Sequence, residues 1–397
     1  MVIVALFSML LSSAQQETLE LSVDQAEELA LLNNYALKNA KLDIENAEHQ
    51  VKEITSMGLP QVKGSAAFMH NYKVATQLIP GDFIGQPGST VPVQFGVPFS
   101  MNATAQLNQL LFDGTFFLGL QAASEFVNIN RLLASQSEIG VKEGVRKAYY
   151  MALISQDNIK QLEQSIENIN KLKSETEAMY KAGFAEKLDV DRLILSSANL
   201  EININNLKQQ ADIAKKVLLN SMGYDVNRDV VLISKLPSFT PENFMETYGV
   251  GYSPTERIEL KILNQQQELN ELNLRRWKMG YVPSLYGTVN YGAQSFAAGG
   301  DFNNLGKDWF GNGMYAVSLN VPIFDGFQKK AIMDQVRVDI AKTKNSLAQA
   351  TNGINLEVSQ ARTEYNSAYK ALDLQKKSLE LAKTIYNTTS IKFKEGV

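Results

Sequence analysis

The sequence predicts a mainly α-helical protein with membrane β-strands, in which several chains together build a long α-helical barrel and a β-barrel. Three observations lead to this fold class. The same order of signals, a helix, a β-hairpin and a long helix, occurs in both halves of the 397 residues. The hairpin strands alternate between apolar and polar residues. Past the N-terminus, no stretch offers the ~18 to 20 continuous apolar residues that a membrane-spanning helix needs.

The chain is predicted to consist of a leader, two repeats and a connecting segment. Residues 1–14 form an apolar run that ends in Ser-Ser-Ala and is typical of a signal peptide, here partial because the basic region is missing. The alternative is an N-terminal core strand. The first repeat covers 15–222, a less regular connecting band covers 223–253, and the second repeat covers 254–397.

The first repeat begins with a helix expected over 22–57. Gly58 suits a helix C-cap, and Pro60 cannot continue the helix, so the chain turns there into a strand. The hairpin is expected over 60–112, with an alternating second strand from Phe99 to Asn108. Its loop is rich in proline and glycine and is expected to be irregular and exposed over 77–97.

A strand-to-helix turn is predicted at Phe112-Asp113-Gly114, after which the sequence is helical for a long stretch. Over 115–182 apolar residues recur at spacings of three and four residues, and this stretch contains no proline. At ~1.5 Å per residue this helix would reach roughly 100 Å. A glycine tip at Gly183 follows, and a return helix is expected over 187–222.

The second repeat runs through the same signals. A helix from Pro254 to Met279 stops at Gly280, and Pro283 opens a hairpin over 283–324. Tyr315 to Ile323 alternates as its second strand. The turn Phe324-Asp325-Gly326 then leads into a long helix expected over 327–394, which approaches a second glycine tip at Gly396.

Strands of ~9 to 11 alternating residues are the unit of a membrane barrel. In lipid every backbone group must be paired, so an open sheet edge is excluded there. Four strands cannot close a barrel on their own, and several chains must therefore contribute to one. A soluble coiled-coil stalk with a β-sandwich has a similar helical composition and is the alternative.

Composition argues against an enzyme and against a nucleic-acid partner. Charge is nearly balanced, with 38 Lys+Arg against 42 Asp+Glu, so the chain has no strongly basic surface. Cysteine is absent, and the two histidines, His49 and His70, lie in segments of different type. We find no Gly-rich phosphate loop and no nucleophile motif. No catalytic residue, cofactor or metal site is predicted.

The order of these motifs resembles that of the TolC-like outer-membrane efflux protein family over the whole chain. Leu59-Pro60 and Val282-Pro283 precede the hairpins, the two Phe-Asp-Gly turns follow them, and residues 180–190 form the tip. The resemblance implies a homotrimer embedded in outer-membrane lipid, with a helical extension through the periplasm. It also implies a periplasmic adaptor protein at the helix tips, an inner-membrane transporter, and a passive conduit for small molecules or secreted polypeptides in a two-membrane bacterium.

The resemblance also suggests roles for individual residues at the tips. Gly183 would supply the tight turn, and Leu188 and Val190 would pack the returning helix. Asp189 is a candidate contact for the adaptor, or an acid favoured by the helix dipole. The candidate docking residues at the two tips are Tyr180, Gly183, Leu188, Asp189, Val190 and Gly396.

The family continues past the second tip with a returning helix, and we therefore expect this sequence to be a fragment, incomplete at both ends. The rival function is a non-transporting trimeric surface stalk, an adhesin-like scaffold without an open lumen. Aromatic residues near the expected strand ends favour the barrel, since such residues gather at membrane interfaces. They are Phe68, Tyr72, Phe99, Tyr291 and Tyr315.

Overall fold

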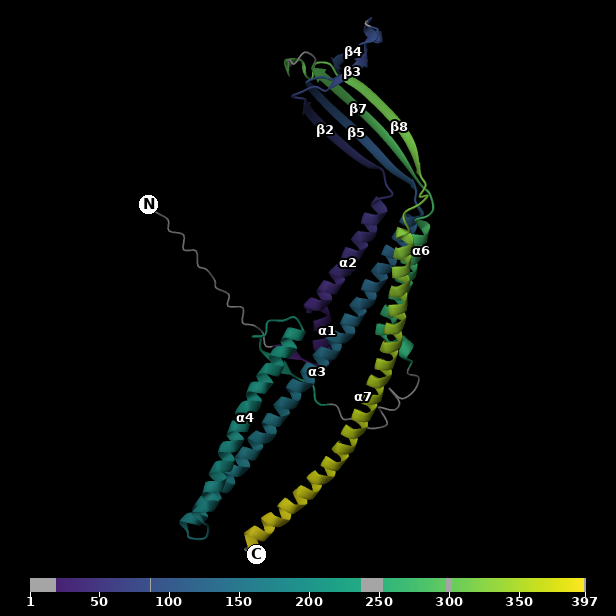
Figure 1. The fold of residues 1–397 in the computed structure, drawn as a ribbon. Helices are drawn as coiled ribbons and strands as arrows, with labels where there is room; N and C mark the ends of the chain where they lie inside the picture. Colours follow the sequence, from purple (N-terminus) through teal and green to yellow (C-terminus); the bar gives the residue numbers. More distant parts are fainter. Residues whose placement is uncertain (1–18, 86, 237–252, 298–301, 396–397) are drawn as a thin grey trace, which may run out of the picture. The chain divides into compact units, whose positions relative to one another are not determined.

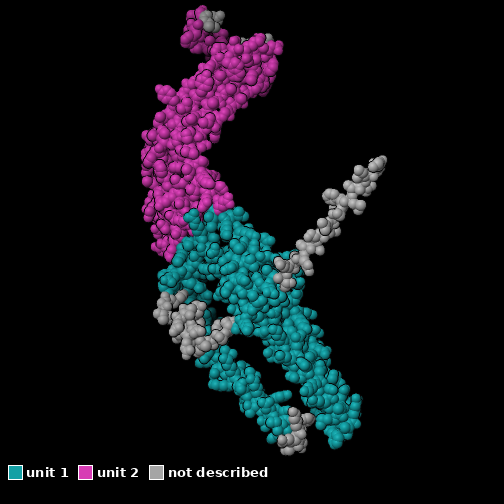
Figure 2. Space-filling view, turned by 180° about the vertical axis from the view of Figure 1, so that it is seen from behind, with its two compact units in different colours: residues 1–44, 130–262, 348–397 teal, residues 45–129, 263–347 magenta. Residues whose placement is uncertain are grey.

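The computed structural model describes residues 19–85, 87–236, 253–297 and 302–395. The expected signal peptide, the tip glycine Gly396 and much of the connecting band lie outside these residues. The chain divides into two compact units. Figure 2 colours unit 1 teal and unit 2 magenta. Unit 1 comprises residues 1–44, 130–262 and 348–397, and unit 2 comprises 45–129 and 263–347.

Long helices dominate the chain, which confirms the mainly α-helical class with two repeats (Figure 1). The two longest, α3 (Gly114–Lys181) and α7 (Gln328–Glu395), contain 68 residues each. They correspond to the helices expected after the two Phe-Asp-Gly turns. The shorter ones are α4 (Lys187–Ser221) and α6 (Ile258–Met279). A 3-10 turn, η2 (Pro254–Glu256), precedes α6, so this helix begins later than expected.

The core of unit 1 gathers around Tyr149 of α3, whose side chain is 0% exposed. Strand β1 (Leu19–Leu21) pairs in parallel with β6 (Val230–Leu232). The Tyr149 hydroxyl donates a hydrogen bond to the Leu21 carbonyl at 2.7 Å and accepts one from the Ser234 N–H at 3.0 Å. A buried hydroxyl needs such partners. The surrounding buried residues include Ala26, Ala30, Val145, Ala152, Leu218, Leu219, Met222 and Leu232.

The single helix expected over 22–57 is wrong, because the structure has two helices, α1 (Val23–Asn33) and α2 (Tyr35–Ser56). Asn34 separates them with an extended ψ of 130°. Its side-chain oxygen accepts the N–H of Ala36 at 2.8 Å, and its amide donates to the Ser221 carbonyl at 2.7 Å. Asparagine caps helix starts well, and this tertiary contact holds the break.

Unit 2 contains a four-stranded sheet in the order β2-β5-β7-β8, in which all neighbours are antiparallel (Figure 1). Because β5 pairs with β7, the hairpins of the two repeats form one continuous sheet. The strand bounds are β2 (Gln61–His70), β5 (Phe99–Phe112), β7 (Ser284–Ala297) and β8 (Phe310–Asn320).

Two expectations for the hairpins need correction. The last strand starts earlier than expected and ends at Asn320 rather than at Ile323, since Pro322 cannot donate to a strand ladder. The first loop is not irregular. It holds a second hairpin of strands β3 (Thr76–Pro80) and β4 (Thr90–Gln94), joined through a 3-10 turn, η1 (Gly81–Ile84).

The loop between β7 and β8 folds back onto the sheet within unit 2. Its 3-10 turn, η4 (Phe302–Asn304), places the Phe302 ring edge-on to those of Phe68 and Phe99, at centroid distances of 6.0 and 5.6 Å. The Gly306 N–H donates to the hydroxyl of Ser295 at 2.9 Å. This explains how the polar Ser295 is fully buried.

Candidate functional site

The four-stranded sheet carries one apolar face. Directly paired residues of neighbouring strands share a face of a sheet. In the register, Val62 pairs with Leu107, Leu107 with Val289, and Val289 with Tyr315. This row and its equivalents two residues away form what we call the apolar face. Its other members include Ala66, Phe68, Met101, Ala103, Ala105, Leu285, Tyr291, Val317 and Leu319.

The opposite side, which we call the polar face, consists mainly of amides and hydroxyls. Its members include Lys63, Ser65, Asn102, Thr104, Gln106, Asn108, Thr288, Asn290, Asn312 and Ser318. Several are joined across strands: the hydroxyls of Ser65 and Thr104 lie 2.7 Å apart, and Thr288 donates to the side chain of Asn108 at 3.1 Å. A hydrated surface suits such side chains.

Away from the end of the sheet that Phe302 covers, the apolar face is uncovered in the protomer. The side chains of Val62 and Val317 are 69% and 67% exposed. Soluble monomers rarely leave a large continuous apolar surface in water, so such a face indicates contact with lipid or with another protein. The alternation between the two faces is the pattern of a membrane strand.

The first strand-to-helix turn, Phe112-Asp113-Gly114, begins α3. Asp113 is the residue before the helix, and its carboxylate accepts hydrogen bonds from the N–H and the hydroxyl of Thr115 at 2.7 and 2.6 Å. This is an N-cap, which satisfies one of the free amide groups of the first turn. The hydroxyl of Tyr286, on β7, lies 3.4 Å from the second carboxylate oxygen.

The second turn, Phe324-Asp325-Gly326, has the same residue types as the first but different backbone conformations and hydrogen-bond partners. Gly326 and Phe327 both have left-handed φ values, 63° and 66°. The Asp325 carboxylate accepts the N–H of Lys329 at 3.2 Å and forms an ion pair with its ammonium group at 3.2 Å. Burial acts to raise the pKa of Asp325, but these two interactions outweigh it and lower the pKa below its ordinary value.

The prolines of the helix-to-strand turns each stand directly before a strand, Pro60 before β2 and Pro283 before β7. Gly58, which the sequence suggested as a helix C-cap, does not adopt the left-handed conformation in which glycine is favoured, because its φ is not positive. Glycine is needed there for space, since a Cβ atom would lie 2.6 Å from the ring of Phe116. At Gly280 the nearest atoms, a Trp277 carbonyl and the Lys329 side chain, would be 3.2 and 3.3 Å away.

The first helix tip lies in unit 1, between α3 and α4. Gly183 has a φ of 85°, and its N–H donates to the Tyr180 carbonyl at 3.0 Å. The N–H of Phe184 donates to Met179 at 2.8 Å. These two bonds form a Schellman motif with glycine in the left-handed position.

Side chains around the tip differ in exposure. Val190 is 6% exposed and packs, whereas Leu188, expected to pack with it, is 51% exposed. Phe184 is 81% exposed. Asp189 lies 3.6 Å from Arg192 on the same helix. The structure thus places the residues of the first tip in unit 1 and both turns in unit 2.

Comparison with known proteins assigns the chain to a family. The family described as outer membrane efflux protein matches residues 26–224 and 261–397, well over half of the chain. The chain belongs to the outer membrane efflux protein family. The match includes both hairpins and both 68-residue helices. A sequence search of curated proteins finds no match.

Solved structures of three membrane proteins share the fold of this family member. The outer membrane protein VceC of Vibrio cholerae gives a TM-score of 0.72 at 13% identity, covering 94% of this chain and 86% of VceC. CusC gives a TM-score of 0.71 at 16% identity, covering 94% of this chain and 82% of CusC. The open state of the MtrE outer membrane channel of Neisseria gonorrhoeae gives a TM-score of 0.66 at 16% identity, covering 94% of this chain and 80% of MtrE.

Membership of the outer membrane efflux protein family confirms the resemblance found in the sequence and the location in the outer membrane, with a helical extension in the periplasm. The family consists of channel proteins rather than enzymes. In the described part of the chain, no three His, Cys, Asp or Glu side chains cluster as metal ligands would. Among the same residues, no helix is both long and apolar enough to span a membrane.

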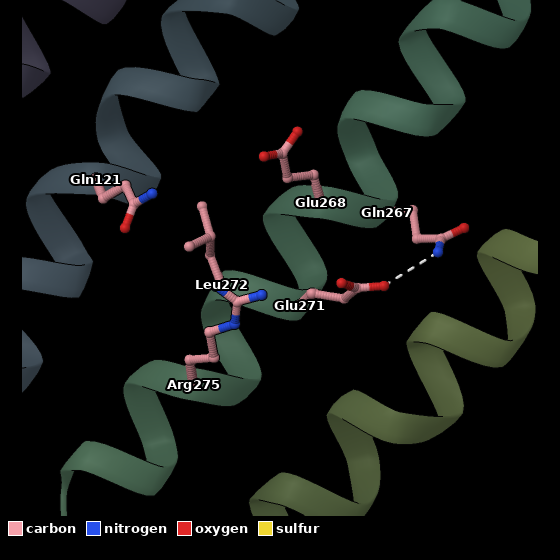
Figure 3. Close-up of a pocket in the computed structure, with 6 residues that line it drawn as sticks. All are labelled: Gln121, Gln267, Glu268, Glu271, Leu272 and Arg275. Carbon is pink, nitrogen blue, oxygen red and sulfur yellow. Dashed lines mark hydrogen bonds between the residues drawn. The ribbon is translucent and has the colours of Figure 1, made fainter.

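One pocket that sequence reasoning did not predict lies in unit 2, where α3 and α6 run side by side. Its volume is about 260 Å³, and it is shown in Figure 3. The side chain of Gln267 donates there to Glu271 at 3.1 Å. Its lining residues are Gln121, Gln267, Glu268, Glu271, Leu272 and Arg275. No sequence signal marks this group, because Gln121 comes from a different helix.

Proposed function

We propose that three copies of this chain form a conduit through the outer membrane. In this assembly the apolar faces meet lipid and the polar faces surround a water-filled lumen. The observation that carries the proposal is the two-faced sheet, whose apolar face is exposed in the protomer. The outer strands β2 and β8 each have one partner in the sheet, and pairing between copies would satisfy their free backbone groups.

We further propose that the conduit is passive and receives its cargo through partners. A periplasmic adaptor protein would dock at the helix tip, and an inner-membrane transporter would supply the energy. The tip supports this role because Phe184 and Leu188 present apolar surface beside a rigid glycine turn. The cargo class is small molecules or secreted polypeptides.

The two faces can be tested with single cysteines, since the chain contains none. Asn290 and Val289 are neighbours on β7 and lie on opposite faces. A water-soluble, charged thiol reagent should modify Asn290→Cys in the assembled channel and reduce its conductance. Val289→Cys should resist this reagent and react with a membrane-permeant maleimide. Equal modification of both by the charged reagent would contradict the assignment of lumen and lipid faces.

The tip can be tested by replacing its glycine. Gly183→Val should prevent the left-handed turn and abolish co-purification of the periplasmic adaptor with the membrane-assembled channel. Gly140→Val is the matched control, because Gly140 lies within α3 with no atom near its Cβ position. Retention of the adaptor by Gly183→Val, in a channel that assembles normally, would exclude this tip as the docking site.

A further inference from the structure

A larger pocket lies in unit 2 where the sheet meets the helices, and we call it the junction pocket. Its volume is about 770 Å³, within the range of small-molecule sites. The end of α2, the starts of α3 and α7, and the end of α6 contribute to it together with β5 and β7. Apolar walls come from Met57, Leu110, Phe116 and the indole of Trp277.

The charged groups of the junction pocket are two cations and one carboxylate, Arg276, Lys329 and Asp113. Lys329 is paired with Asp325 at 3.2 Å. Asp113 accepts the hydrogen bonds of Thr115 that cap α3. Both of these groups are therefore already engaged within the protein.

Arg276 differs from them. Within the residues that the structure describes, it forms no ion pair, and its guanidinium lies 5.7 Å from the ring centroid of Trp277. Its neighbour Arg275 faces a different environment, in the pocket that also contains Glu268 and Glu271 (Figure 3). Arg276 thus brings an unneutralised, half-buried charge to a mainly apolar cavity.

We propose that the junction pocket binds an amphipathic anion. A guanidinium recognises carboxylate, phosphate or sulfonate groups through paired hydrogen bonds. The rings of Trp277 and Phe116 offer the flat apolar surface that an aromatic or acyl body requires. The hydroxyl of Tyr286, also in the lining, already donates to the Asp113 carboxylate at 3.4 Å, so recognition of the anionic group falls to Arg276.

Two residues that line the junction pocket show which face of the sheet it adjoins. Leu110 pairs with Tyr286, and both belong to the polar face. If the polar face lines the lumen, the junction pocket is a binding site for cargo inside the conduit. This placement rests on the proposed function. The same chemistry would also bind the headgroup of an acidic membrane lipid.

The chain has two tryptophans, which makes the pocket measurable. In a Trp309→Phe background, Trp277 is the sole reporter. We would titrate the assembled channel, in nanodiscs of zwitterionic lipid, with 4-bromobenzoate, whose bromine quenches indole fluorescence. The expected result is saturable quenching that 4-bromobenzylamine does not reproduce. Arg276→Gln should weaken binding roughly ten-fold, whereas Arg276→Lys should retain part of it and Arg275→Gln all of it.

Unsaturable quenching, equal quenching by the amine, or an equal effect of Arg275→Gln would overturn the proposal. Acidic lipid added to the nanodiscs distinguishes a lipid headgroup from cargo as the natural ligand. If the acidic lipid competes with 4-bromobenzoate, the site binds a lipid headgroup. If it does not compete, the site binds cargo. Conductance of the same preparation keeps the two proposals apart. A conducting channel without saturable quenching would refute the pocket alone, and saturable quenching in a channel that never conducts would refute the conduit alone.

Discussion

At the scale of single residues, the same backbone motif occurs twice in unit 1 with different surroundings. Gly183 and Gly223 both end a helix in a Schellman turn, with φ values of 85° and 77°. No atom lies within 4 Å of a Cβ built at Gly183, whereas one at Gly223 would meet the Asn33 carbonyl oxygen at 2.4 Å. One glycine is required by conformation alone and the other also by packing.

This difference predicts unequal costs for the same substitution. Gly183→Ala should cost about 1 kcal/mol, the penalty of a left-handed alanine. Gly223→Ala should add the cost of overpacking, roughly 1–3 kcal/mol more. Thermal unfolding followed by the helical circular dichroism signal would compare the two variants. Equal losses would show that the approach of Asn33 to Gly223 is not a constraint.

Residues also show where sequence reasoning reached its limit at the site. The sequence marks both Phe-Asp-Gly turns, but their repetition does not reveal that Asp113 caps a helix while Asp325 binds Lys329. Gly58 was assigned a conformational role although it makes room for Phe116. Such roles depend on side chains from distant segments, and periodicity carries no information about them.

At the scale of elements, β5 and β8 could be predicted from their alternation, and the long helices from their apolar spacing. The hairpin of β3 and β4 could not, because proline and glycine outweighed the short alternating run around Val91 and Val93. The break at Asn34 was also missed. A bond from Asn34 to Ser221, 187 positions away, holds it in place.

The two faces of β8 predict unequal effects of an arginine substitution. Val317 and Ser318 are adjacent, on the apolar and the polar face respectively. Arginine near mid-bilayer on a lipid-facing strand costs ~2–4 kcal/mol, while lumen positions tolerate it. Val317→Arg should therefore reduce the amount of heat-stable oligomer in outer-membrane fractions, and Ser318→Arg should leave it unchanged. A reversed order would mean that the faces are exchanged.

At the scale of the whole molecule, the unit of function proposed here is larger than the chain. An exposed apolar face and two outer strands, each with one partner, are costly in a protomer alone. In the proposed ring of copies around a common lumen, the apolar faces would contact lipid and the outer strands would pair with those of neighbouring copies. The sequence could predict that several chains are needed, because four strands are too few for a barrel, but the number of copies came only from family resemblance.

Single-channel conductance, recorded on purified protein whose oligomer mass is measured in the same detergent sample, tests the central claim most directly. We predict a mass of three chains and stable, ohmic conductance in a planar bilayer. Addition of the periplasmic adaptor would reveal a channel that rests closed. A folded trimer that never conducts, with or without the adaptor, would contradict the conduit and favour a non-transporting surface stalk.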